Sequence, residues 1–225
     1  MMMRRYMIVW LLAMMVQGVV FAQRQQRFDF DGTQLAAEWQ FLGQPDRSHY
    51  DQNNGRLRLY GSVGQLKDKK PVTFVGLPQT EDRFTVETCI SYFDFEDNDE
   101  AGVALYLSDR CYVQAYVYSN RNEPRVRMRF RLLNHWWQMA SPSALLQAGK
   151  CWLRVVGDEQ GYHFFYSLDG KKYQLLETVE RCLLSPAISE TTKAPLLGIY
   201  AYTGTTKYQS GYSFADFDYF EYQAQ

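Results

Sequence analysis

Apolar and polar side chains alternate along most of this chain with a period of two residues. In the clearest stretch, 125–132, four arginines alternate with Val126, Met128, Phe130 and Leu132. Successive side chains of a β-strand point to opposite faces of a sheet, so this alternation predicts strands with one buried face. The same pattern predicts strands at 56–59, 84–89, 102–107, 111–118, 125–132, 152–156, 162–167, 173–178, 196–202 and 214–222.

Residues that favour tight turns separate these strands, among them Asn53-Asn54-Gly55, the segment 157–161 and Asp169-Gly170. No segment shows a convincing helical periodicity. About ten or more short strands with regular turns predict an all-β fold, an antiparallel two-sheet sandwich of the lectin-like, jelly-roll type. No linker or internal repeat interrupts the chain, so we expect one domain over residues 23–225.

The first 22 residues have the features of a secretory signal peptide. Arg4 and Arg5 precede the apolar run 7–16, and Val20-Phe21-Ala22 fits a cleavage site before Gln23. The apolar run is short for a membrane span. We therefore expect a cleaved signal and a secreted or periplasmic product with no membrane span in the mature chain; an uncleaved anchor is the alternative.

Loss of Arg4 and Arg5 from the 24 basic residues leaves 22 against 25 acidic ones, a net charge of −3. A chain so close to neutrality has no overall attraction to nucleic acid, and we expect no nucleic-acid partner. Four cysteines follow the signal: Cys89, Cys111, Cys151 and Cys182. Export permits disulfides in any of three pairings, and buried free thiols are equally compatible with the sequence.

Five short segments, in this order, resemble a known family: 38–45 (EWQFLGQP), 55–59 (GRLRL), 100–106 (EAGVALY), 165–170 (FYSLDG) and 214–222 (FADFDYFEY). Together they look like the concanavalin A-like C-terminal domain of β-xylosidases and arabinofuranosidases, over Phe28 to Tyr222. In that family the catalytic carboxylates lie on a separate five-bladed propeller, and the sandwich can lend an aromatic side chain to the sugar pocket. The resemblance implies the accessory sandwich alone, and it implies a glycoside hydrolase as a candidate partner.

Candidate catalytic residues are not evident. A glycosidase needs two carboxyl groups in a cleft, and the acidic segment 94–100 is typical of a solvated loop. His49, His135 and His163 are far apart, and neither a Gly-x-Ser-x-Gly nor a His-Glu-x-x-His motif occurs. We expect no catalytic residue here, with a glycoside hydrolase as the alternative.

Four aspartates are candidate ligands of a structural calcium ion. Asp29 and Asp31 lie near the first strand, and Asp216 and Asp218 lie in the last. Terminal strands of such sandwiches commonly pair, which would bring hard oxygen donors together. The alternative is that these are ordinary surface aspartates. No other cofactor is expected.

One predicted sheet face carries an unusual set of aromatic and basic side chains. Tyrosine and tryptophan rings pack on sugar C–H groups, and guanidinium groups bind carboxylates in a bidentate manner. We expect an oligo- or polysaccharide site on the concave side of the sandwich, formed by Tyr106, Tyr112, Gln114, Tyr116, Tyr118, Arg125, Arg127, Arg129, Trp136 and Trp137.

Two other interpretations of this face stay open. The arginine stems can cover the tyrosine rings and pair with acids across the sheet, or the face can dock a partner protein. The sequence thus favours an exported, non-catalytic carbohydrate-binding sandwich. A glycoside hydrolase, or an accessory subunit of one, and a protein-interaction module of the cell envelope are the alternatives.

Overall fold

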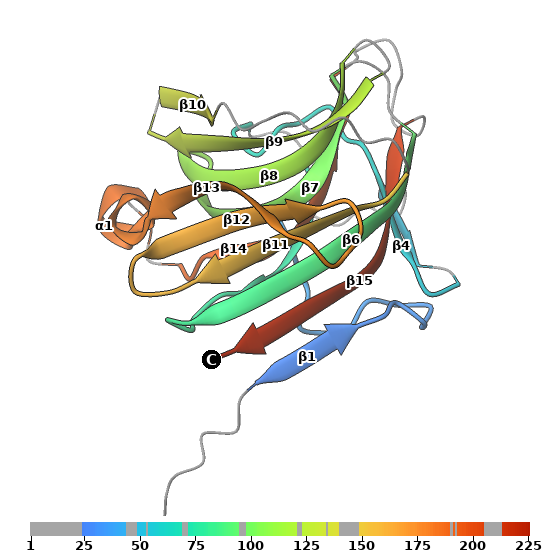
Figure 1. Cartoon of the computed structure of the whole chain (residues 1–225), viewed down its shortest axis with the longest axis horizontal. Helices are drawn as coiled ribbons and strands as arrows, with labels where there is room; N and C mark the ends of the chain where they lie inside the picture. The colour runs from blue at the N-terminus through green and yellow to red at the C-terminus, as the bar shows by residue number, and fades with distance from the viewer. Residues whose placement is uncertain are drawn as a thin grey trace, which may run out of the picture.

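The computed structural model describes residues 24–43, 49–52, 54–68, 72–94, 98–120, 123–133, 135–139, 149–189, 191, 193–204 and 213–225. The expected signal peptide, residues 1–22, lies outside this part of the chain. Two antiparallel sheets face each other, so the predicted all-β sandwich is confirmed (Figure 1). Within the described ranges, no helix is both long and apolar enough to cross a membrane.

The first sheet, called sheet A, runs in the order β13 (Gln174–Glu180), β12 (Gly161–Ser167), β11 (Cys151–Gly157), β6 (Phe84–Asp94), β15 (Phe214–Ala224), β4 (Leu57–Tyr60) and β3 (Tyr50–Gln52). Strand β1 (Gln25–Phe28) pairs with β15, and the two lie side by side in Figure 1. The first and last strands therefore meet, as expected from the sequence.

The second sheet, called sheet B, runs in the order β10 (His135–Met139), β9 (Glu123–Leu132), β8 (Cys111–Asn120), β7 (Glu100–Ser108), β14 (Leu196–Tyr202), β5 (Thr73–Pro78) and β2 (Gln40–Phe41). A 3₁₀ helix (Arg181–Leu184) and the short α1 (Pro186–Ser189) connect β13 of sheet A to β14 of sheet B.

The main core lies between the two sheets and uses the apolar positions that the alternation identified. From sheet B, Val113, Ala115 and Met128 are fully buried in the same cluster as Ile90 and Phe217 of sheet A. Burying a side chain of the size of Val113, Met128, Ile90 or Phe217 contributes about 1.5–3 kcal/mol to folding, so this layer contributes strongly to stability.

A second apolar layer covers the opposite, outer face of sheet B. It contains Phe74 of β5, Tyr200 of β14, three tyrosines of β8 and Leu66, which comes from the segment 61–68. Strand β5 was not predicted, because Phe74 enters this layer while Val75 and Leu77 enter the core. With both faces buried, β5 shows no alternation.

Candidate functional site

The two polar rows that the sequence singled out lie on the outer face of sheet B. The hydrogen-bonding register of β8 and β9 places the following residues opposite each other: Tyr112 and Arg131, Gln114 and Arg129, Tyr116 and Arg127, Tyr118 and Arg125. The neighbours Val113, Ala115 and Met128 point into the core. The predicted division into a core face and a polar face is thus confirmed for both strands.

The tyrosines do not form an open stacking surface. Tyr112, Gln114 and Tyr116 expose no more than 2% of their surface. The guanidinium of Arg129 lies 4.8 Å from the ring centre of Tyr116, and that of Arg127 lies 4.3 Å from the ring centre of Tyr118. Arginine stems and guanidinium groups therefore cover the rings, which was one of the alternatives left open by the sequence.

A pocket of about 530 Å³ remains at one end of this face. Its lining combines four of the expected residues with six others: Tyr116, Tyr118, Arg127 and Arg129, together with Gln65, Asn98, Glu100, Ser119, Tyr202 and Gly204. Strands β7, β8, β9 and β14 all contribute to the pocket, and Gln65, Asn98 and Gly204 come from the segments between strands. Its volume is within the usual range for small-ligand sites.

The other expected residues lie outside this pocket. Tyr112 and Gln114 are buried beside it, and Arg125 donates a 2.7 Å hydrogen bond to Glu123. Tyr106 lies at the opposite end of β7 and lines a different pocket, of about 640 Å³, together with Phe41, Leu42 and Pro78.

The two tryptophans separate onto opposite faces of sheet B. Trp136 pairs with Arg131 and contacts Tyr112, so it shares the outer face. Trp137 pairs with Phe130 and stacks on its ring at 5.6 Å, on the core side. The two rings therefore lie on opposite faces of β10, and a contact of either ring with carbohydrate stays a prediction.

Glu100 and Arg129 form the polar centre of the outer face. The Arg129 guanidinium donates to Glu100 Oε1 at 2.7 Å and to Oε2 at 3.2 Å, and it also reaches the Tyr116 hydroxyl at 2.9 Å. Gln114 Nε2 donates to Glu100 Oε2 at 3.2 Å and to the Tyr200 hydroxyl at 2.5 Å. These bonds fix the orientation of Glu100, Arg129 and Tyr116 in the pocket wall.

Burial shapes the proton affinities of these groups. Desolvation raises the pKa of Glu100, although Arg129 and Gln114 oppose the shift. Burial lowers the affinity of Arg129 for its proton, but the charge and hydrogen bonds of Glu100 and the nearby Tyr116 and Tyr200 together outweigh this effect and raise the Arg129 pKa. Tyr200 is fully buried, and desolvation raises its pKa well above the ordinary value. The hydroxyl therefore stays protonated.

Glu100 was not predicted as a site residue, because the acidic segment 94–100 is typical of a solvated loop. Asp99 and Glu100 are both buried, and the Asp99 carboxylate accepts a 2.9 Å hydrogen bond from the Gly204 amide. The signal was present, because Glu100 continues the alternation of 102–106 and lies opposite Tyr118 in the sheet. Glu100 therefore belongs to the polar row and not to a loop.

The expected calcium ligands are not brought together. In the part of the chain that the structure describes, no group of three or more His, Cys, Asp or Glu side chains is placed to hold a metal ion. Asp29 accepts a 2.8 Å hydrogen bond from Arg27, and Asp31 lies near Gly55 at the β3–β4 turn. Asp218 pairs with Lys150 at 3.0 Å.

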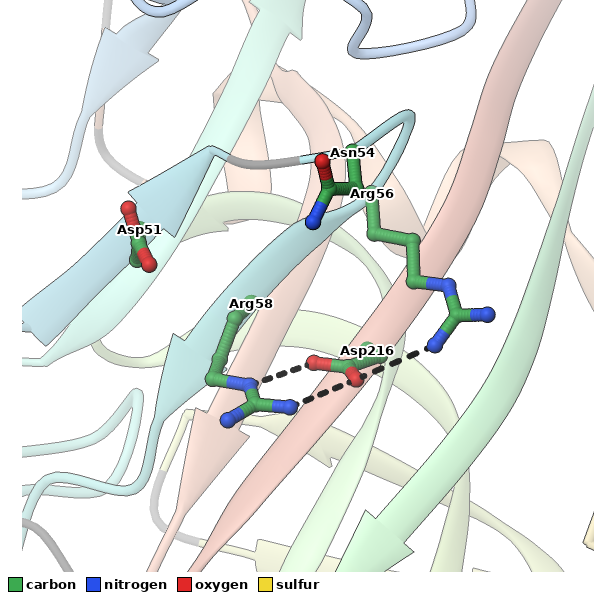
Figure 2. Close-up of a pocket in the computed structure, with 5 residues that line it drawn as sticks. All are labelled: Asp51, Asn54, Arg56, Arg58 and Asp216. Carbon is green, nitrogen blue, oxygen red and sulfur yellow. Dashed lines mark hydrogen bonds and ion pairs between the residues drawn. The ribbon is translucent and has the colours of Figure 1, made fainter.

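Asp216 lies in a pocket of about 300 Å³ on the outer face of sheet A. Figure 2 shows Arg58 donating two hydrogen bonds to its carboxylate, at 2.7 and 2.9 Å, while Arg56 approaches to 3.9 Å from the other side. Asp51 and Asn54 complete this pocket. Two guanidinium groups satisfy Asp216, so a cation would have to displace them.

All four cysteines are free thiols. Cys89, Cys111 and Cys151 are buried, and Cys182 is exposed. Desolvation raises the pKa of Cys89 to about 12 and that of Cys111 to about 11. Three of the thiols are therefore structural and unreactive in the folded chain.

Comparisons with known proteins all point to one family. A family model described as the β-xylosidase C-terminal concanavalin A-like domain matches residues 27–223. A non-reducing end α-L-arabinofuranosidase of Bacteroides ovatus is 23% identical over 206 residues, which are 91% of this chain and 38% of that protein. The chain thus spans less than two fifths of this relative.

Solved structures show the same fold. The GH43 protein BlXynB of Bacillus licheniformis superposes with a TM-score of 0.78 at 23% identity, covering 88% of this chain and 39% of that one. A xylan β-1,4-xylosidase of Bacillus halodurans gives 0.76 at 20% identity, with 88% and 38% covered. Here too the match is limited to part of a longer enzyme.

Proposed function

The chain belongs to the family of β-xylosidase C-terminal concanavalin A-like domains, and from this premise we propose that it is a non-catalytic carbohydrate-binding sandwich. Its site is the pocket at the end of the outer face of sheet B, whose walls include Glu100, Arg127 and Tyr202. The proposal rests on the hydrogen-bonding and aromatic side chains that line this pocket.

The lining offers what a sugar ring requires. Amide groups of Gln65 and Asn98, the Ser119 side chain and tyrosines supply donors and acceptors for hydroxyl groups. Buried contacts fix Glu100 and Arg129 beforehand, so little side-chain entropy is lost on binding. A volume of about 530 Å³ suits one or two sugar rings rather than a long chain.

The same lining supports binding over hydrolysis. Glycosidases act through two carboxyl groups about 5–9.5 Å apart, and Glu100 is the one carboxylate among the described residues of the pocket wall. Both of its oxygens already accept hydrogen bonds from Arg129. A catalytic residue pair is therefore not available from the described walls.

A second candidate role is that of an accessory part of a glycoside hydrolase. This role is favoured because the chain matches only part of longer enzymes: relatives named as arabinofuranosidase and xylosidase match it over only 38% of their own length. In this role the sandwich would present carbohydrate to a hydrolase partner. Export through residues 1–22 agrees with either role, and N-terminal sequencing of the secreted product should begin at or near Gln23.

Calorimetry with xylo-, arabino- and uronate-containing oligosaccharides tests the proposal. We expect binding by the intact chain and a loss of about fivefold or more in Tyr202→Ala, because truncating an aromatic residue in a binding pocket commonly costs about 1–4 kcal/mol. Asn54→Ala, in the pocket on sheet A, is the control and should bind normally. Hydrolysis of aryl glycosides that disappears in Glu100→Gln would overturn the non-catalytic assignment.

A further inference from the structure

We propose that the pocket on sheet B recognises a sugar that carries a carboxylate, a uronic acid, and that Arg127 is the residue that binds this carboxylate. This inference rests on the proposed carbohydrate-binding function and specifies its ligand class. It follows from the charges along the arginine row and from the position of Arg127.

The four arginines of β9 differ in how their charges are neutralised. Arg129 pairs with Glu100 at 2.7 Å, and Arg125 pairs with Glu123 at 2.7 Å. Arg127 and Arg131 have no acidic partner in the described ranges, and each stacks on an aromatic ring instead. Two of the four guanidinium groups thus keep an uncompensated positive charge.

Only one of these two charges faces the pocket. Arg127 lines it, whereas Arg131 lies over the Trp136 ring at 4.6 Å, outside the described lining. Glu100, the one acid of the described lining, is already paired with Arg129. The pocket therefore carries a net charge of about +1, and partial burial strengthens this charge relative to the open surface.

The Arg127 guanidinium is also prearranged. It packs on the Tyr118 ring at 4.3 Å, which holds its plane, and this ring is itself buried. A planar guanidinium with unused N–H groups binds a carboxylate through two parallel hydrogen bonds. Because the side chain is held in place before the ligand arrives, little of the binding energy is spent on ordering it.

The surroundings favour a uronic acid over other anions. A single uncompensated cation matches a monoanionic, planar carboxylate better than a phosphate with nearly two charges. Around Arg127, Gln65, Asn98 and Tyr202 offer hydrogen bonds that fit the ring hydroxyls of a sugar. A simple carboxylate such as acetate would leave these groups unused.

Calorimetry with trigalacturonate and its methyl ester tests the inference, because the ester keeps the shape of the ligand and removes its charge. We expect the acid to bind at least about tenfold more tightly than the ester at low salt. This difference in affinity should decrease as the salt concentration rises. Arg127→Gln should abolish this preference, and Arg127→Lys should retain part of it. Arg131→Gln, which removes an equally unpaired charge outside the pocket, is the matched control and should keep the preference.

The outcomes separate the inference from the proposed function. Equal binding of acid and ester, lost in Tyr202→Ala, would retain carbohydrate binding and overturn the role of Arg127. An equal loss of acid preference in Arg127→Gln and Arg131→Gln would show general charge attraction and also overturn it. Binding of neither these ligands nor any neutral oligosaccharide would overturn the proposed function itself. Circular dichroism and thermal melting establish that each variant is folded. If Arg127→Gln does not fold, Arg127→Lys takes its place as the test variant.

Discussion

Arg129 on β9 reaches across the whole width of β8 to Glu100 on β7, with 2.7 Å between Arg129 Nη2 and Glu100 Oε1. The side chains are only 18% and 9% exposed. Gln114, on the intervening strand, donates to the same carboxylate. This ion pair therefore ties three strands together on the face that holds the pocket.

We expect Glu100→Gln to destabilise the fold by about 3 kcal/mol, because removing one member of a buried ion pair leaves the other charge without compensation. Chemical denaturation followed by tryptophan fluorescence measures the change. Glu123→Gln is the control, since Glu123 makes an arginine contact of the same length but is 53% exposed. Exposed pairs contribute at most about 1 kcal/mol. Similar losses in the two variants would contradict a special role for Glu100.

Much of the sandwich could be predicted because most strands have one buried and one polar face. Each of the ten predicted segments corresponds to an observed strand, and the turn at Asn54 and Gly55 has the positive φ values, 54° and 71°, that its sequence suggested. Strand β5 could not be predicted from alternation, since Phe74 and Val75 are buried on opposite faces.

The site was harder to predict, because a sequence pattern shows which side chains share a face but not what covers that face. Tyr112 and Tyr116 were placed correctly, yet Leu66, from a distant segment, and the arginines of β9 bury them. Likewise, Asp216 has the residue type of a metal ligand, but the register that puts it opposite Arg58 decides its partner.

Glycine at position 102 is required by the close approach of β7 and β8. A Cβ atom there would lie 2.1 Å from the Ala115 carbonyl oxygen and 2.6 Å from the Tyr116 Cα, both backbone atoms that cannot move aside. We expect Gly102→Ala to cost at least about 3 kcal/mol or to prevent folding. In Gly149→Ala the added Cβ would lie 3.9 Å from the Ser91 carbonyl oxygen, the nearest atom among the described residues, so the melting temperature should stay unchanged. A normal melting temperature for Gly102→Ala would refute this account of the packing.

Thiol reactivity should distinguish the four cysteines. In the native protein at pH 8, a disulfide reagent such as DTNB should modify one thiol per chain quickly, that of the exposed Cys182. Burial raises the pKa of Cys89 to about 12 and that of Cys111 to about 11, so little thiolate forms there. Denaturation should expose all four, and Cys182→Ser should remove the fast reaction. Fewer than four thiols after denaturation would instead reveal a disulfide.

The final prediction concerns acid stability and the β12–β13 turn. Asp169 Oδ1 accepts hydrogen bonds from the amides of Lys172 and Lys171, both at 2.8 Å, and from the Ser167 hydroxyl at 3.0 Å. These donors favour the charged carboxylate and lower the Asp169 pKa to about 2. In the unfolded chain the pKa returns to the ordinary value, about 3.9.

A carboxyl group whose pKa is lower in the folded state stabilises the fold at pH values above its pKa in the unfolded state. This contribution is lost as the pH falls from about 4 to about 2. Asp169→Asn should therefore weaken the fall in melting temperature across this window, because the amide cannot take up the proton. Thermal melting as a function of pH measures this effect. Ser167→Ala, which removes one donor of three, should raise the Asp169 pKa part of the way, and NMR titration of the Asp169 carboxyl carbon measures that shift. An Asp169 that titrates near pH 4 in the folded protein would show that the turn does not hold its carboxylate as described.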